Sequence, residues 1–291
     1  MKKWGILLLT VICLAVFISS CATYDNCVER VDYGVATGTG GYGRRITTAC
    51  WDDETEAPTF SEGLAVVKKK NKYGYVNKAG KSVIKPKFDY ASGFSGGMAA
   101  IKVNDKWGYI DKTGKIVIEP MFDDASFFNK GLAGVKVNAK WGYIDSTGKT
   151  FIEPQFDKVQ LFYGNIAGVK INDKWGYINK IGIVVIKPKF DEAKPFFGGL
   201  AGVKVNGKWG YIGKTGKVVI KPQFEEVQLF FEGLAAVKVK GKWGYINKVG
   251  NIVIEPKFDS VGYFISEPIE VELNGKTVWI DKTGKVVPKP Q

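Results

Sequence analysis

The 291-residue chain contains no histidine. Histidine is the base of Ser-His-Asp and Cys-His nucleophile pairs and the imidazole ligand of many metal sites, so its absence excludes the commonest hydrolase and zinc chemistries. Glycine is abundant, with 36 residues, and 45% of the chain is hydrophobic. This glycine content argues against an all-helical fold, and the apolar content argues against low-complexity disorder.

Long hydrophobic runs are also scarce, and the clearest one lies at the N-terminus. Lys2 and Lys3 precede an apolar run over residues 4–18, which is short for a membrane span but suits a secretory signal. The run leads into Ile18-Ser19-Ser20-Cys21, which resembles the lipobox of bacterial lipoproteins. The resemblance implies that residues 1–20 are a signal peptide and that Cys21 is lipidated. The alternative is an ordinary signal peptide cleaved nearby, which would leave Cys21 free for a disulfide.

We therefore expect an exported, membrane-anchored lipoprotein at the outer membrane or cell surface of a bacterium, held by its lipid alone. In an oxidising compartment the remaining even pair, Cys27 and Cys50, predicts one disulfide. Residues 21–58 are interpreted as a lipid-anchored, glycine-rich linker, because residues 33–45 have neither helical nor strand periodicity. Residues 38–43 fit G-x-G-x-x-G, but no buried strand precedes them and no helix follows, so a nucleotide site is not predicted.

From residue 59 to residue 291 the sequence repeats with a period of 34 residues. Tyr73 lies one period before the first tryptophan of the series and Thr277 one period after the last, which gives seven units. The tryptophans are Trp107, Trp141, Trp175, Trp209 and Trp243. Helical repeats can have the same period, but the glycines and proline of each unit leave no room for an uninterrupted helix.

Each unit instead predicts a β-meander of three strands, for example over residues 234–239, 243–246 and 252–254. Asn at the first joint favours a tight hairpin with positive φ, and Asp or Asn followed by Gly at the second joint favours a type I turn. Gly213 replaces that Asp in the fifth repeat, so a looser turn is expected there. The third strand is expected to stop at a proline, which cannot donate to a ladder. These prolines are Pro86, Pro120, Pro154, Pro188, Pro222, Pro256 and Pro288.

Alternation places apolar residues on both faces of each meander, so neighbouring units must pack face to face. The large tryptophan side chains are then expected to form the structural core and to be the main contact between units.

The recurring Lys-Trp-Gly-Tyr-Ile segments, as at 106–110 and 242–246, are each followed by D/N-x-x-G and I-x-P-x-F. They resemble the bacterial WG (KWG) repeat family over residues 59–291. The resemblance implies tandem β-rich repeats, often in exported proteins, with no established catalytic residues. We favour an open superhelical stack, because the terminal units turn polar and 34 residues are few for a four-stranded blade. The alternative is a closed seven-bladed β-propeller.

Two columns of lysine recur with the repeats and form a candidate anion-binding ladder. The residues are Lys102, Lys136, Lys170, Lys204 and Lys238 in one column and Lys106, Lys140, Lys174, Lys208 and Lys242 in the other. The alternative is that their stems cover the aromatic rings while the ammonium groups stay in water. Carboxylate pairs such as Asp191-Glu192 are interpreted as solvated turns, and the acidic run at 52–54 lacks the features of a calcium loop. No catalytic residue, metal or cofactor is predicted.

The sequence supports two hypotheses of function. The first is a non-enzymatic, lipid-anchored envelope scaffold that presents a repeat surface to a protein or an anionic envelope polymer. The second is a carbohydrate-binding module that uses exposed Trp and Tyr. Nucleic acid is not expected as a partner, because the export signal keeps the chain away from it. The oligomeric state is left open.

Overall fold

The computed structural model describes residues 23–24, 27–35, 42–50 and 59–290. The expected signal peptide, residues 1–20, and the expected lipidation site Cys21 lie outside the described residues. Every regular element that is described is a β-strand, and no helix in this part of the chain is long and apolar enough to span a membrane. The chain divides into two compact units, one ending at Phe128 and the other beginning at Asn129.

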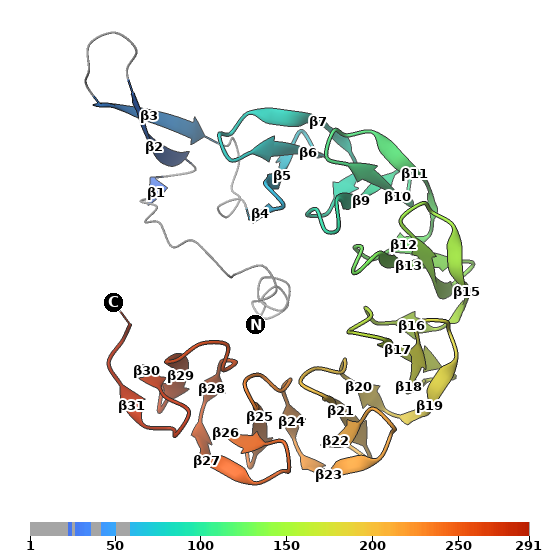
Figure 1. Cartoon of the computed structure of the whole chain (residues 1–291), viewed down its shortest axis with the longest axis vertical. Coiled ribbons are helices and arrows are strands. Elements are labelled where there is room, and N and C mark those ends of the chain that lie inside the picture. The colour runs from blue at the N-terminus through green and yellow to red at the C-terminus, as the bar shows by residue number, and fades with distance from the viewer. Residues whose placement is uncertain (1–22, 25–26, 36–41, 51–58, 291) are drawn as a thin grey trace. The chain divides into compact units, whose positions relative to one another are not determined.

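Seven four-stranded antiparallel sheets follow one another along the chain, one for each repeat (Figure 1). The first strand of each is a two-residue edge strand: β4 (Phe60–Ser61), β8 (Tyr90–Ala91), β12 (Asp124–Ala125), β16 (Lys158–Val159), β20 (Glu192–Ala193), β24 (Glu226–Val227) and β28 (Ser260–Val261). The first long strands are β5 (Leu64–Lys69), β9 (Met98–Val103), β13 (Leu132–Val137), β17 (Ile166–Ile171), β21 (Leu200–Val205), β25 (Leu234–Val239) and β29 (Ile269–Leu273).

The middle strands carry the Trp-Gly-Tyr segment: β6 (Lys72–Asn77), β10 (Lys106–Asp111), β14 (Lys140–Asp145), β18 (Lys174–Asn179), β22 (Lys208–Gly213), β26 (Lys242–Asn247) and β30 (Lys276–Ile280). The last strands form the other edge: β7 (Ser82–Phe88), β11 (Ile116–Phe122), β15 (Thr150–Phe156), β19 (Val184–Phe190), β23 (Val218–Phe224), β27 (Ile252–Phe258) and β31 (Val286–Val287).

The all-β class and the seven repeats are confirmed, but the expected number of strands per repeat was one too low. The additional strand is very short, as where Glu192 and Ala193 pair with Lys204 and Val203. Two residues are too few to show a periodicity, so this strand could not be predicted from the residue pattern. No sheet among the described residues closes on itself, which is consistent with the open stacking of repeats that the sequence favours.

The turns between the first two long strands have the predicted geometry. Asn172 and Asp173 have φ values of 48° and 61°, and Asn206 and Gly207 have values of 50° and 77°. Both central residues are therefore left-handed, as a tight hairpin that follows the strand twist requires.

The last strand of a repeat does not end at its proline, as the sequence suggested. β19 continues through Pro188 to Phe190, and its register with β18 shifts on both sides of Tyr177. A bulge in an edge strand tolerates proline because no ladder donor is needed there. The same holds in the first six repeats, and only β31 ends before its proline, Pro288.

The turn that opens with Gly213 is not looser in its backbone than the others. Gly216 N donates to Gly213 O and Gly213 N donates to Lys217 O, both at 2.9 Å. What the turn lacks is the side chain of an aspartate. In the second repeat, Asp111 Oδ1 accepts from Thr113 N, Thr113 Oγ1 and Lys115 N at 2.6 to 3.1 Å.

We expect Gly213→Asp to stabilise the chain, because it recreates the Asp-Lys-Thr-Gly-Lys turn of residues 111–115. Relative to Gly213→Ala, which changes only the backbone entropy, the gain should be about 1 kcal/mol from the added hydrogen bonds. Urea unfolding of the two variants measures it, and equal midpoints would contradict the prediction.

The expected linker contains strands, which corrects its interpretation as a spacer without regular structure. β2 (Cys27–Val35) pairs antiparallel with β3 (Tyr42–Cys50), and β1 (Thr23–Tyr24) pairs with β2. Both nine-residue strands are rich in β-branched and aromatic residues, which favour strands. The glycines between them obscured this pattern.

The core lies between successive sheets, as the alternation predicted. Tyr177 and Ile186 of one sheet cluster with Ala201, Val203 and Ile212 of the next. Tyr177 also reaches the loop beyond β20, where its hydroxyl donates to Lys194 O at 2.8 Å. Burial raises the pKa of this hydroxyl, which keeps it a protonated donor.

Tyrosine, and not tryptophan, is the fully buried aromatic residue of the middle strand in the first six repeats. The fully buried tyrosines are Tyr75, Tyr109, Tyr143, Tyr177, Tyr211 and Tyr245. Trp209 is buried, but the other four predicted core residues, Trp107, Trp141, Trp175 and Trp243, are only half-buried. Each tryptophan precedes the tyrosine by two residues on the same face, so its large ring reaches the margin of the sheet. Trp141, Trp175 and Trp243 pack against the core clusters from the margin, and the role of the tryptophans as the main contact between units stays a prediction.

Candidate functional site

Each sheet has two chemically different ends. The hairpin end carries the turn between the first and middle long strands, such as 172–173. The turn end carries the turn between the middle and last strands, such as 179–183, together with the loop that leads into the first long strand. The register fixes this assignment, because Ile171 pairs with Lys174 at the hairpin end and Ile166 pairs with Asn179 at the turn end.

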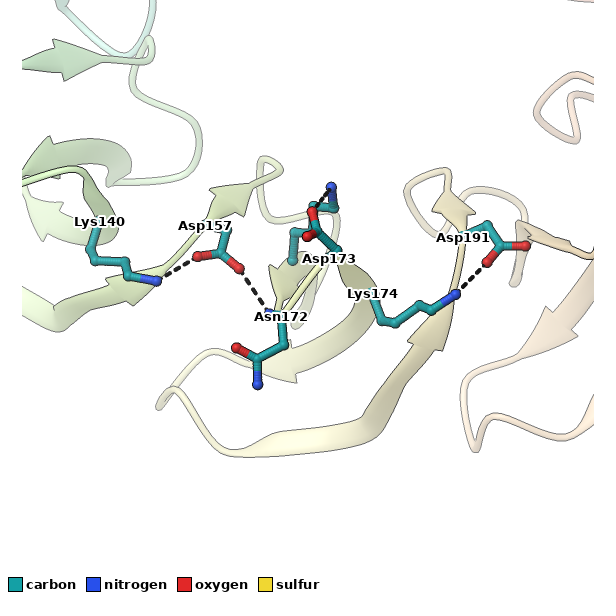
Figure 2. Close-up of polar contacts among 7 residues, drawn as sticks. Lys140, Asp157, Asn172, Asp173, Lys174 and Asp191 are labelled. Carbon is teal, nitrogen blue, oxygen red and sulfur yellow. Dashed lines mark hydrogen bonds and ion pairs between the residues drawn. The ribbon is translucent and has the colours of Figure 1, made fainter.

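At the hairpin end, a lysine of one repeat is joined to the next repeat through a carboxylate that we call the latch aspartate. Lys174 Nζ lies 2.6 Å from Asp191 Oδ1, and Asp191 Oδ2 accepts from Asn206 N at 2.9 Å. Figure 2 shows the preceding latch, in which Asp157 joins Lys140 to the backbone of Asn172. The ion pairs are Lys72–Asp89, Lys106–Asp123, Lys140–Asp157, Lys174–Asp191 and Lys242–Asp259.

Hydrogen bonding holds the latch aspartates in their charged form. The Lys140 hydrogen bond is the largest cause that lowers the pKa of Asp157, and those from Lys174 and the Asn206 backbone do the same for Asp191. A carboxyl whose pKa is lowered on folding stabilises the fold above its ordinary pKa. That contribution is lost as the pH falls through the lowered value.

We therefore expect the free energy of unfolding to decrease as the pH is lowered from neutral to below the ordinary pKa of a carboxyl group. Asp157→Asn combined with Asp191→Asn should make the urea midpoint less dependent on pH over this window, with the largest loss at neutral pH. Glu153→Gln is the matched control, since Glu153 is an exposed carboxylate in the same repeat that forms no ion pair with the described residues. An unchanged pH profile in the double variant would contradict the expectation.

The other lysine column is also largely paired. Its ion pairs are Lys102–Asp105, Lys170–Asp173, Lys204–Glu192 and Lys238–Glu226, at 2.7 to 2.9 Å. Together with the latch pairs, eight of the ten lysines of the candidate anion-binding ladder have an acidic partner; the other two are Lys136 and Lys208. The columns thus present ion pairs and few free cations, which weakens the case for an anion ladder at this end.

The lysines also cover the tryptophan rings. Lys238 Nζ lies 5.7 Å from the centroid of Trp243, and Lys204 Nζ lies 5.8 Å from that of Trp209. A second lysine, Lys194, lies 5.1 Å from the Trp209 ring, which explains why this tryptophan is more buried than the others that the structure describes. Burial lowers the pKa of Lys194. Cation–π contacts of this kind link Lys204 and Lys238 of the first column to the tryptophan rings beside them.

The carboxylate pairs have structural partners. Asp191 is a latch, and Glu192 pairs with Lys204. Glu225 accepts from the backbone N–H groups of residues 240 and 241, which together with nearby lysines lower its pKa, and Glu226 pairs with Lys238. Among the residues that the structure describes, no three His, Cys, Asp or Glu side chains gather in a way that could hold a metal ion.

The backbone register brings Cys27 opposite Cys50 across β2 and β3. Directly opposed residues of an antiparallel pair have Cα atoms about 4.5 to 5.5 Å apart, within the range of disulfides. The Cys27–Cys50 disulfide stays a prediction, and this register is compatible with it.

Sequence reasoning missed the character of the turn end. In the unit that begins at Asn129, every exposed large hydrophobic side chain among the described residues lies there. The signal was present as the apolar residues that open most of the last strands, such as Val218-Val219, but the apolar residues of each meander were expected to be packed between neighbouring units.

A chain of similar four-stranded antiparallel sheets, joined from one repeat to the next by recurring ion pairs such as Lys174–Asp191, defines a tandem β-repeat protein. This architecture suggests a scaffold or interaction role. The family model described as "WG containing repeat" matches the chain seven times, at residues 55–73, 73–107, 107–141, 141–175, 175–209, 209–243 and 243–276. The chain therefore belongs to the WG-repeat family, as its sequence indicated.

Comparison with solved structures found distant likenesses. Hsv2 of Kluyveromyces lactis is 10% identical, with a TM-score of 0.44 over 65% of this chain and 71% of that one. The extracellular domain of a hybrid two component system of B. thetaiotaomicron is 9% identical, with a TM-score of 0.42 over 80% of this chain and 40% of that one. No curated protein matched the sequence.

Proposed function

We propose that the chain is a non-enzymatic, lipid-anchored scaffold of the bacterial cell envelope that presents its repeat surface to a protein or an anionic envelope polymer. The observation that carries the proposal is the repetition of one sheet in which most of the hairpin-end lysines that the structure describes are paired with carboxylates, within the sheet or in the next repeat. Charged groups that are engaged in such ion pairs support a structural role for this end. The net charge of +13 falls to +11 when the expected signal peptide is removed with Lys2 and Lys3, and a charge of this sign favours anionic partners.

The lipid anchor is tested by metabolic labelling with radioactive palmitate. The full chain should incorporate label, and Cys21→Ser should abolish it. Labelling that persists in Cys21→Ser would remove the anchor from the proposal.

The interaction role is tested by retention on isolated peptidoglycan and envelope polysaccharide. Retention should fall as the salt concentration rises, because exposed charges are screened within about 10 Å at 0.1 M salt. If retention does not change with salt, an anionic polymer is excluded as the partner, and the proposal keeps only a protein partner.

The carbohydrate-binding alternative needs tryptophan faces that are open to a sugar. The lysines over Trp209 and Trp243 occupy that position, so the present geometry favours the scaffold. If added sugars shift the tryptophan fluorescence emission at constant salt, the carbohydrate-binding function would be favoured instead.

A further inference from the structure

Exposed apolar side chains are segregated to one end of the second unit, residues 129–290. Ile181 is 69% exposed and Val249 is 70% exposed, at the tips of two turns. Every exposed large hydrophobic residue described in this unit lies at the turn end. The set is Phe151, Ile181, Ile183, Val184, Val185, Val218, Val219, Val249, Ile252, Val253, Ile265 and Val286. Single exposed apolar residues are ordinary, but a set confined to one face indicates an interaction surface.

Contacts between repeats join these residues into a continuous strip. A Cβ built on Gly182 would lie 3.3 Å from Ile152 Cγ2, so the turn that carries Ile181 lies against the strand that carries Phe151. The same contact joins Gly216 to Ile186 and Gly250 to Ile220. Each turn therefore lies beside the exposed pair of the preceding repeat.

A row of aromatic rings runs along the same end. The centroids of Tyr163 and Phe197 are 6.2 Å apart, those of Phe197 and Phe231 are 4.4 Å apart, and those of Phe231 and Tyr263 are 4.8 Å apart. All four rings are half-buried. Phe197 bridges to Leu200, whose partner across the sheet is Gly213, so the rings and the turns share one end.

The three central turns of this end carry positive charge, whereas at the last turn Lys282 pairs with Glu267 at 3.2 Å. The three central turns, at 179–183, 213–217 and 247–251, contain four lysines and no acid. These lysines, Lys180, Lys214, Lys217 and Lys248, form no ion pair with the described residues. The hairpin end of the same sheets differs, since most of its lysines are engaged by carboxylates.

We propose that the turn end of residues 129–290 docks on an anionic lipid bilayer. Aliphatic side chains at turn tips can enter the headgroup region without a complementary pocket, and aromatic rings are favoured at that depth. The ammonium groups beside them attract anionic phosphates, each contributing about 1 kcal/mol near such a surface. The docking face goes beyond the proposed lipid anchor and is independent of lipidation at Cys21, and it would set which end of the sheets faces the membrane.

Hydrogen exchange of the full chain, followed by mass spectrometry, tests the proposal locally. The chain is mixed with vesicles of phosphatidylcholine alone or with added phosphatidylglycerol. Peptides that cover 179–185 and 247–253 should exchange more slowly only with the anionic vesicles, while peptides around 172–174 should not change. An N-terminal attachment alone would leave the turn peptides unprotected, so this result is distinct from that of the palmitate experiment.

Two sets of variants separate the apolar and the charged contributions. Ile181→Thr combined with Val249→Thr introduces the residue found at the equivalent positions 113, 147, 215 and 283, so the turns should keep their fold. This double variant should lose the protection of the turn peptides. The triple variant Lys180→Gln, Lys214→Gln and Lys248→Gln should no longer be protected more by anionic vesicles than by vesicles of phosphatidylcholine alone. Met121→Gln, which removes an exposed apolar side chain outside the turn end, should keep both.

Three outcomes would overturn the proposal. They are no protection with either vesicle, protection at the hairpin-end peptides instead, and protection that survives Ile181→Thr with Val249→Thr. The first would indicate that the apolar strip binds a protein.

Discussion

Gly176→Ala should destabilise the chain by about 3 kcal/mol or more, because the bulged last strand leaves no space for a side chain. A Cβ on Gly176 would lie 2.5 Å from Ile186 O and 2.7 Å from Pro188 N. Both are backbone atoms of β19, so no side chain can rotate away to make room. The glycine of the Trp-Gly pair is therefore required by the neighbouring strand of its own sheet.

Gly213→Ala is the control for this prediction. Gly213 does not have a positive φ, and its nearest neighbour would be 3.7 Å from an added Cβ. Its effect should stay within about 1 kcal/mol. Urea unfolding followed by far-UV circular dichroism measures both variants, and a similar cost for the two would show that the backbone contact is not limiting.

Tyr177→Ala should cost more stability than Trp175→Ala, although tryptophan is the larger residue. Removing a buried aromatic ring costs about 3 to 5 kcal/mol, and this change also leaves the Lys194 carbonyl without its donor. The half-buried Trp175 should cost about half as much, since part of its surface is already in water.

Tyr177→Phe separates the two contributions of the tyrosine. It keeps the contact with the Phe196 ring, whose centroid is 4.8 Å away, and should lose only about 1 to 3 kcal/mol for the buried carbonyl. If Trp175→Ala proves the most damaging of the three, the assignment of the core to tyrosine is wrong.

The sequence predicted the features that depend on local chemistry. Positive φ at Asn172 and Asp173 and the left-handed Gly182 follow from turn preferences, and the packing of both faces follows from alternation. Depth within the core could not be predicted in this way. Trp175 and Tyr177 share one face, and only the length of the strand and the position of its hairpin place one ring at the margin and the other in the centre.

The site was harder to predict than the fold. The lysine columns were visible as a pattern, but their partners lie far along the chain. Asp191 is 17 residues from Lys174 and belongs to the next repeat, so this pairing depends on how two sheets meet. Glu192 is 12 residues from Lys204 and lies on the short edge strand of the same sheet, which was not predicted from the sequence. The exposure of Phe151 and Val218 at the turn end could not be predicted either, because both are residue types that are usually found in a core.

The latch has a consequence for how such a chain can change in length. The main polar contacts between neighbouring sheets recur at fixed separations, such as 17 residues from Lys174 to Asp191 and 33 from Gln160 to Ala193. Removing or duplicating one whole period, cut at any point within it, restores each of these separations at the new junction. Recombination between repeats can therefore shorten or extend the array without creating a mismatched seam, so repeat number is open to selection while each contact is kept.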